Sequence, residues 1–131
     1  MMWKMLQAIK YLKDICKKII FVDSTIRFAK IINDKGHLVT WATKENIQFY
    51  VNVQEHEMLF MEAALRSRIL YEFDSSLSIV NFYVYHRKNV ITMKFLMENQ
   101  TIYVSAEKEI DLNTIPVTIL KPISKENMPS I

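Results

Sequence analysis

The chain has a single glycine among its 131 residues, Gly36, and this glycine lies between two apolar runs, 26–32 and 38–41. Asn33 and Asp34, just before it, are residue types that open turns by accepting hydrogen bonds from their own backbone. Glycine takes a positive φ without a Cβ clash, which a tight hairpin turn usually requires. The stretch IRFAKIINDKGHLVTW therefore predicts a β-hairpin. One glycine cannot form a GxxxxGKS or GxGxxG loop, which excludes the usual nucleotide-binding signatures.

The first 22 residues predict an amphipathic helix. Several lysines and Asp14 interrupt this segment, so it offers neither the apolar core of a signal peptide nor a membrane span. Its apolar side chains recur at steps of three and four, which places them on one face of a helix. The residues of this face are Met5, Ile9, Leu12, Cys16 and Ile19, with Leu6, Ile15 and Ile20 at its margins.

Residues 1–23 carry the whole net charge of the protein. They hold five lysines and two aspartates, a net charge of +3, whereas the other 108 residues hold 12 basic and 12 acidic groups. We expect these lysines to form the solvated face of a helix packed on a sheet. The alternative is a basic strip that attracts anionic lipid or an acidic protein partner, an attraction that weakens with salt. The strip consists of Lys10, Lys13, Lys17 and Lys18.

A second helix is predicted over about 53–72. Asn52 and Glu55 have the spacing of a capping box, and acidic residues suit the positive end of the helix dipole. The helix is apolar nearly all round. Its three apolar faces contain Met58, Met61, Leu65 and Ile69; Leu59, Ala63 and Leu70; and Phe60, Ala64 and Tyr71. Such a helix in a small protein is either covered by the other helices or lies in an oligomer interface.

Three strands and a short helix are predicted after the second helix, and the strands form a meander. The strands are expected at 76–86, 90–97 and 101–106, with turns at 87–89 and 98–100. The short helix is expected around 115–120, capped by Asp111 or Thr114, and Pro116 is tolerable there only in the first turn. Residues 122–131 are expected to be a mobile tail.

Length and composition indicate one folded domain, residues 1–121. Half of the residues are hydrophobic and about a quarter are charged, as in ordinary globular proteins, and the length leaves no room for a second domain. Cys16 cannot form an internal disulfide, and no Cys/His cluster has the spacing of a zinc site. We therefore expect a cytoplasmic protein without a metal or cofactor.

The predicted order is helix, strand, strand, helix, strand, strand, strand, short helix, which is an α+β fold with a five-stranded antiparallel sheet. This order and the IINDKGHLV hairpin resemble the roadblock/longin group of profilin-like domains over residues 1 to about 121. The resemblance implies that the second helix covers one face of the sheet and the terminal helices the other. The segments MLFMEAALRSRILYEFD and TIYVSAEKEID also resemble a small uncharacterised family from ammonia-oxidising archaea, which suggests an archaeal source.

The roadblock resemblance implies a non-enzymatic homodimer, paired through the second helix and the third strand, that is a platform for a small Ras-like GTPase or a larger assembly. The strand 76–86 would be an aggregation hazard as an open edge, and pairing with a copy of itself would satisfy its backbone groups. We predict an interface of Leu59, Phe60, Ala63, Ala64, Tyr71, Leu77, Ile79, Tyr83 and Tyr85. A charged residue at Phe60 or Tyr83 should then give monomers or aggregates.

Other function classes stay open. A small-molecule sensor of the PAS or GAF type has a similar order of elements, and eight Met with many aromatic residues could line an apolar pocket. An enzyme is disfavoured because His37, His56 and His86 have no Ser, Cys or carboxylate at a catalytic spacing. Nucleic-acid binding is disfavoured because the charge outside the first helix is balanced. The residues that keep it open are Tyr83, Tyr85, Tyr103, Arg87 and Lys88.

Overall fold

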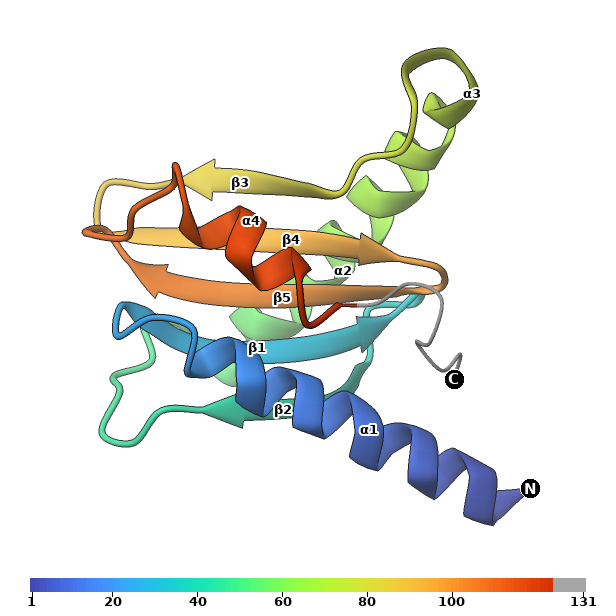
Figure 1. Cartoon of the computed structure of the whole chain (residues 1–131), viewed down its shortest axis with the longest axis horizontal. Coiled ribbons are helices and arrows are strands. Elements are labelled where there is room, and N and C mark those ends of the chain that lie inside the picture. The colour runs from blue at the N-terminus through green and yellow to red at the C-terminus, as the bar shows by residue number, and fades with distance from the viewer. Residues whose placement is uncertain (124–131) are drawn as a thin grey trace.

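In the computed structural model, which describes residues 1–123, five strands form one antiparallel sheet with helices on both faces (Figure 1). The elements are α1 (Met2–Ile20), β1 (Ile26–Asn33), β2 (Leu38–Thr43), α2 (Val53–Tyr71), α3 (Asp74–Leu77), β3 (Phe82–His86), β4 (Val90–Met97), β5 (Gln100–Glu107) and α4 (Ile115–Leu120). The strand order is β2-β1-β5-β4-β3, and every neighbouring pair is antiparallel. The predicted α+β class, strand number and order of the long elements are confirmed.

The two faces of the sheet differ in chemistry because side chains alternate along the strands. α1 and α4 cover one face (Figure 1), and this face is aliphatic. Its residues on the central strands are Ile91, Met93, Phe95, Ile102, Val104 and Ala106. α2 covers part of the other face, over a smaller cluster that contains Phe28, Phe60 and Tyr103. The intervening residues of β4 and β5, many of them polar, therefore lie on the α2 side.

Gly36 lies in the turn between β1 and β2 and meets two constraints. Its φ is +81°, and its N–H donates to the Asn33 carbonyl over 3.0 Å, while the Asn33 side chain accepts two more backbone N–H groups of the turn. A Cβ at position 36 would lie 2.9 Å from the Met61 Cα and 3.1 Å from the Phe60 carbonyl oxygen of α2. The predicted hairpin is confirmed, and the turn requires glycine for its conformation and for its contact with α2.

The predicted first helix is α1, and only its second half packs on the sheet. The buried residues are Leu12, Ile15, Cys16, Ile19 and Ile20. Met5 and Leu6, which were expected at the same apolar face, are exposed instead. The first turns of α1 extend beyond the sheet (Figure 1), so there is no surface for these side chains to pack against.

α2 begins with the predicted capping box. The Asn52 side chain accepts from the Glu55 N–H over 2.8 Å, and the Glu55 carboxylate accepts from the Asn52 N–H over 3.1 Å, so two N–H groups of the helix end are satisfied. The C-terminal end of α2 projects beyond the sheet together with α3 (Figure 1). α1 and α4 lie on the opposite face of the sheet, so they do not cover α2. The alternative that the other helices cover this helix is therefore wrong.

The predicted strand 76–86 is shorter in the structure. β3 begins only at Phe82, and residues 74–77 form α3 instead. Ser78 follows α3 with a φ of +70°, and a residue in this left-handed region cannot continue an extended strand. The alternating apolar side chains of this stretch, Leu77 and Ile79, are therefore exposed rather than part of a sheet.

The C-terminal elements follow the prediction in position but not in the helix cap. Pro116 lies in the first turn of α4, and Thr114 precedes the helix without a side-chain capping hydrogen bond. The Asp111 carboxylate instead accepts from the Thr114 hydroxyl over 2.9 Å. Ile123 is buried in the aliphatic core, which corrects the predicted start of the tail at residue 122. The remainder of that predicted tail, 124–131, lies outside the described residues.

We predict that Gly36→Ala lowers the free energy of unfolding by about 2–4 kcal/mol, because left-handed strain of about 1–2 kcal/mol adds to overlap with the α2 backbone. Asn46→Ala is the matched control, since Asn46 has a φ of 59° and is exposed, and should cost about 1 kcal/mol. Urea denaturation measures both changes. Equal losses for the two variants would contradict the role given to the α2 contact.

Candidate functional site

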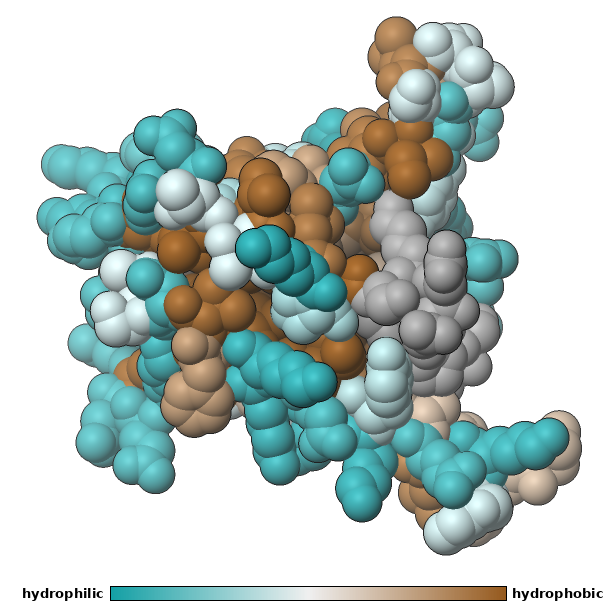
Figure 2. Space-filling view, in the orientation of Figure 1, coloured by the Kyte–Doolittle hydropathy of each residue, from teal (hydrophilic) through white to brown (hydrophobic). Residues whose placement is uncertain are grey.

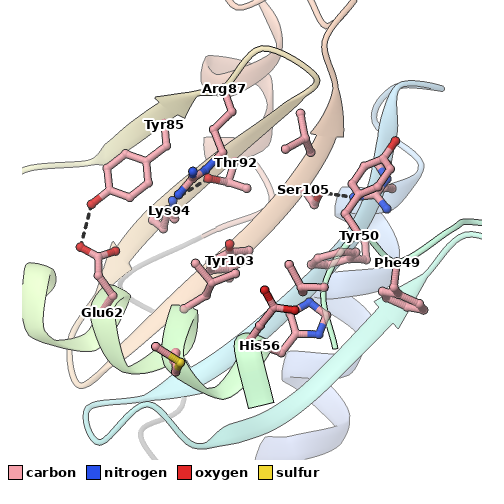
Figure 3. A pocket seen from close by; sticks show the side chains of 17 residues that line it. Phe49, Tyr50, His56, Glu62, Tyr85, Arg87, Thr92, Lys94, Tyr103 and Ser105 are labelled. Atoms are coloured by element: carbon pink, nitrogen blue, oxygen red, sulfur yellow. Dashed lines mark hydrogen bonds between the residues drawn. The ribbon is translucent and has the colours of Figure 1, made fainter. Parts of the chain in front are cut away.

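A pocket of about 410 Å³ lies between the sheet and the N-terminal half of α2. Strands β1, β3, β4 and β5 contribute to its floor, α2 forms one wall, and the loop 44–52 between β2 and α2 forms another (Figure 3). α2 lies mainly over β1 and β5. The α2 side of β3 and β4 is therefore left partly open, and its polar side chains line the pocket.

Lys94, in the middle of β4, is buried in the pocket floor with 1% of its surface exposed. Its Nζ donates to the Thr92 hydroxyl over 2.6 Å and lies 3.6 Å from the centroid of the Tyr85 ring (Figure 3). An aromatic face attracts a cation but does not replace its hydration. Burial therefore lowers the pKa of Lys94 to about 7; the carboxylate of Glu62 opposes this shift and the cation of Arg87 reinforces it.

A bulge in β1 brings Arg27 into the same pocket. The register between β1 and β5 shifts between Ile26 and Phe28, so Arg27 is the extra residue, and a bulge of this kind re-aims a side chain. Arg27 is 6% exposed. Its guanidinium donates to the Ser105 hydroxyl over 2.7 Å and to the Gln48 carbonyl of the loop.

A third buried cation, Lys30, lies beside the pocket among aromatic rings. Its Nζ is 4.6 Å from the Phe28 ring centroid and 5.1 Å from the Phe49 ring centroid. His56 of α2 stacks on Phe60 with 5.4 Å between the ring centroids. Burial, and then the nearby cations, lower the pKa of His56, so its imidazole is neutral at neutral pH.

The acidic side chains around the pocket already have partners. The Glu62 carboxylate accepts from the Tyr85 hydroxyl over 2.8 Å (Figure 3) and pairs with Arg66 over 3.4 Å. Glu55 belongs to the capping box. The Glu62 contact is the one ion pair within residues 1–123, so no described carboxylate pairs with either cation of the floor. The floor of the pocket therefore holds two cations, Arg27 and Lys94, without a direct ion pair, and Glu62 acts on Lys94 only from a distance.

The residues predicted for a dimer interface divide between core and surface. Phe60, Ala63 and Ala64 are buried under α2, and Leu59 packs against the same cluster. The burial of Phe60, Ala63 and Ala64 corrects the predicted interface at these three positions, because this side of α2 is turned toward the chain's own sheet; Leu59 is partly exposed, and its place in an interface stays a prediction. The exposed apolar stripe of α2 consists instead of Met58, Met61, Leu65 and Ile69.

The other predicted interface residues follow the C-terminal end of α2 and β3. Tyr71 is exposed, although its hydroxyl donates to the Met97 carbonyl over 2.5 Å. Leu77 and Ile79 are exposed in and after α3. Tyr83 and Tyr85 are half-buried on β3, and Tyr85 belongs to the pocket. The structure thus leaves the residues near α3 at the surface and places Tyr85 beside Lys94.

The four lysines of the predicted basic strip, Lys10, Lys13, Lys17 and Lys18, are all exposed along α1. Figure 2 shows hydrophilic residues along the outer side of this helix. The Lys13 Nζ lies 5.4 Å from the Trp41 ring centroid of β2. The strip is therefore accessible to solvent, as both predictions for these lysines require.

The described residues offer few groups for covalent or metal chemistry. Residues 1–123 contain no group of three or more His, Cys, Asp and Glu placed to hold a metal ion. Cys16 is buried, and burial raises the pKa of its thiol to about 12, so the thiol stays protonated at neutral pH. No helix in this part of the chain is long and apolar enough to cross a membrane.

The pocket agrees in part with the one that the sensor alternative predicted. That alternative expected Met and aromatic residues around an apolar space; Met58 and several aromatic side chains do line the pocket, but its floor also contains Arg27 and Lys94. Arg27, Thr92, Lys94 and Ser105 were not singled out from the sequence. The sequence contains one signal for this site, since Lys94 is the only charged residue in the otherwise mainly apolar run VITMKFLM. Three of the tyrosines noted for nucleic-acid binding, Tyr83, Tyr85 and Tyr103, lie around Lys94.

The arrangement of sheet and helices matches solved roadblock domains. The Roadblock/LC7 domain from Streptomyces avermitilis has a TM-score of 0.64 at 8% identity, over 83% of this chain and 88% of that chain. MglB from Myxococcus xanthus has a TM-score of 0.66 at 10% identity, over 87% and 83%. A structure described as MglB with tetrameric arrangement has a TM-score of 0.68 at 9% identity, over 83% and 79%. The chain has the roadblock fold, as the resemblance implied.

The sequence matches one family model over almost its full length. Residues 5–129 match DUF6659, a family of unknown function, and the chain belongs to this family. No curated protein matches the sequence. The archaeal source that the second resemblance suggested stays a prediction.

We predict that Lys94→Met stabilises the protein at neutral pH and that this gain shrinks as the pH rises. The pKa of Lys94 is about 7 in the folded protein and near its ordinary 10.5 in the unfolded chain. Between these values the unfolded state binds more protons, so the stability of the original protein rises with pH, by at most about 1.4 kcal/mol per pH unit. Urea unfolding at about pH 7 and about pH 9 should show a gain that is about 2 kcal/mol smaller at the higher pH.

Lys88→Met is the control for this experiment, since Lys88 is exposed in the turn 87–89. Its effect on stability should not change between the two pH values. Burial raises the pKa values of Tyr83 and Tyr85, so the measurements stay below the pH at which tyrosines of the unfolded chain titrate. A gain from Lys94→Met that is independent of pH would contradict a buried charge at this position.

Proposed function

We propose that the chain is a non-enzymatic, self-associating scaffold or regulatory module, in which a second copy packs on the exposed side of α2 and on α3. The observation that carries this proposal is the exposed apolar stripe of α2, which continues into Phe73, Leu77 and Ile79. Figure 2 shows hydrophobic residues gathered at the projecting end of α2 and α3. A projecting apolar surface of this kind is rarely left exposed in a monomer.

The edge of the sheet next to this surface supports the same proposal. β3 is an edge strand, and among the described residues it pairs only with β4. An edge strand with an open row of backbone groups can pair with a copy of itself, which gives a symmetric interface. α2 and the edge strand β3 would then both contribute to the interface between two copies, although β3 is shorter than predicted.

The partner that fits this proposal is another protein. The roadblock resemblance led us to expect a platform for a small Ras-like GTPase, and we keep this as the proposed partner class. One of the similar structures is described as a tetrameric arrangement of MglB, which supports assembly as a property of this fold. A cytoplasmic location is part of the proposal, because the one cysteine is buried and unpaired.

We predict that the double variant Leu65→Glu, Ile69→Glu converts a dimer into a monomer, because two charges would be desolvated at the centre of the interface. Both side chains are exposed in the chain by itself, so the variant should fold. Light scattering of the purified proteins measures the mass. Phe60, proposed earlier for this purpose, is unsuitable because a charge there would disrupt the core.

Val117→Glu is the control for the dimer, because Val117 is an exposed apolar residue on α4, on the other face of the sheet. It should leave the mass of the dimer unchanged. A monomeric original protein, or a dimer that persists in the double variant, would contradict the proposed interface.

A second candidate function is favoured by the free end of α1. Met2, Trp3, Met5 and Leu6 are exposed there, beside the basic strip. An amphipathic helix with a basic face and exposed apolar residues binds anionic membrane surfaces or acidic partners. The role of α1 would then be to hold the scaffold at such a surface.

We predict that the protein sediments with vesicles containing phosphatidylserine at low salt and dissociates as salt is added. Lys10→Glu with Lys17→Glu should weaken this binding about tenfold or more, since each basic residue near an anionic surface contributes about 1 kcal/mol. Lys88→Glu, outside α1, should weaken it less. Binding that is equal for neutral and anionic vesicles would contradict the electrostatic part of this role.

A further inference from the structure

We propose that the pocket between α2 and the sheet binds a small organic anion, a carboxylate or phosphate attached to a flat ring. The anionic group would lie on the cationic floor and the ring between the aromatic walls. This inference does not rest on self-association, because the cations that would bind the anion, Arg27 and Lys94, belong to strands of the sheet, and of the exposed stripe of α2 Met58 alone lines the pocket. It assigns to the pocket a ligand class that the scaffold role does not require.

The floor of the pocket is a row of polar groups with a cation at each end. Thr92 of β4 and Ser105 of β5 are directly paired across the sheet, so their hydroxyl groups lie side by side. Ser105 accepts from Arg27 over 2.7 Å, and Thr92 accepts from Lys94 over 2.6 Å (Figure 3). An anion above the two hydroxyl groups would be within reach of donors from both cations, which is the arrangement that charge-assisted hydrogen bonds require.

Both cations of this row keep unused capacity to donate. An ammonium group has three N–H donors, and the hydroxyl of Thr92 is the one hydrogen-bond acceptor that Lys94 has among the described residues. The guanidinium of Arg27 has five N–H donors and donates to two oxygens, of Ser105 and Gln48. Arg87 also lines the pocket and adds a third positive charge near its mouth.

No carboxylate of residues 1–123 forms a direct ion pair with Arg27 or Lys94. Glu62 and Glu55 line the pocket, but Glu62 is paired with Arg66 and Tyr85, and Glu55 caps α2. Buried cations are costly unless an anion compensates them. A bound anion would supply this compensation and would favour the charged form of Lys94.

The aromatic residues around the pocket suit a flat apolar body. In the floor, Phe28 and Tyr103 form a stacked pair with ring centroids 6.3 Å apart, and in the wall formed by the loop 44–52, Phe49 and Tyr50 are exposed over the pocket (Figure 3). Aromatic side chains bind flat rings by offset stacking and edge contacts. The volume of about 410 Å³ lies within the range of small-molecule sites, roughly 300–1,000 Å³.

The depth of the cations favours a free small molecule over an acidic side chain of a protein partner. Lys94 and Arg27 are 1% and 6% exposed, so they do not form a surface patch that a folded partner could cover. A ligand must enter the pocket to reach them. Surface attraction through the lysines of α1 is a separate property, on the other face of the sheet.

The test compares three probes with the same ring: naphthalene-2-carboxylate, 2-naphthyl phosphate and the neutral naphthalene-2-carboxamide. Calorimetric titration of the full chain gives their affinities, and NMR line shifts locate the binding. We expect at least one anion to bind about tenfold or more tightly than the amide, with shifts at β4, β5 and the loop 44–52. The order of the two anions distinguishes a carboxylate site from a phosphate site.

Variants test whether the cations of the floor cause the tighter binding of the anions. Lys94→Met approximately keeps the length of the side chain and removes its charge, and urea unfolding of the variant checks independently that it is folded. It should reduce the preference for the anion to about twofold or less. Arg27→Met should act in the same direction, whereas Lys88→Met, which changes a lysine outside the pocket, should leave the preference intact.

Three results would overturn the proposal. The first is equal binding of the anions and the amide, which would make the pocket merely apolar. The second is a preference that survives in both Lys94→Met and Arg27→Met. The third is an anion preference with line shifts confined to α1, which would place the binding at the basic strip.

Discussion

The alternation of side chains along β4 and β5 is the constraint on which the rest of the structure depends. Alternate residues of these two strands, 91 to 97 of β4 and 102 to 106 of β5, face α1 and α4 and are buried in one mainly aliphatic core, which provides most of the apolar burial that stabilises a domain of this size. The other face of the same strands is thereby free to carry hydroxyl groups, tyrosines and Lys94. One sheet thus separates the part of the protein that holds the fold from the part that contains the candidate site.

The sequence predicted those elements whose signals are local. The capping box of α2, the turn at Gly36 and the position of Pro116 each depend on residues within one turn of the chain, and all three occur in the structure. The strand expected at 76–86 is too long, because its extent depends on where the sheet ends and not on a local signal. Its alternation was real, but Leu77 and Ile79 belong to a segment that projects beyond the sheet with α2, and periodicity does not say where a sheet ends.

The pocket could not be predicted because it is assembled from distant segments. Arg27 reaches it only through a bulge, whose register shift is set by pairing with β5 and leaves no pattern in the sequence. Periodicity also does not indicate which of the three apolar faces of α2 packs on the sheet. Phe60 was therefore predicted in an interface, whereas it lies in the core. Lys94 carried a signal, since a lysine in an apolar central strand needs aromatic or polar neighbours, but those neighbours lie on other strands.

The contact at Gly36 also fixes how the pocket can change shape. The turn backbone touches α2 at Met61, and one turn and a half further along the Ser67 hydroxyl lies 3.0 Å from the Thr101 hydroxyl of β5. Two separated points of attachment define a line, so the helix cannot pivot on the sheet without breaking one of them. The wall that α2 forms is therefore held at two points, whereas the loop 44–52 is held to the floor through the hydrogen bond from Arg27 to the Gln48 carbonyl. A change in the width of the pocket that keeps both contacts of α2 would have to come from this loop.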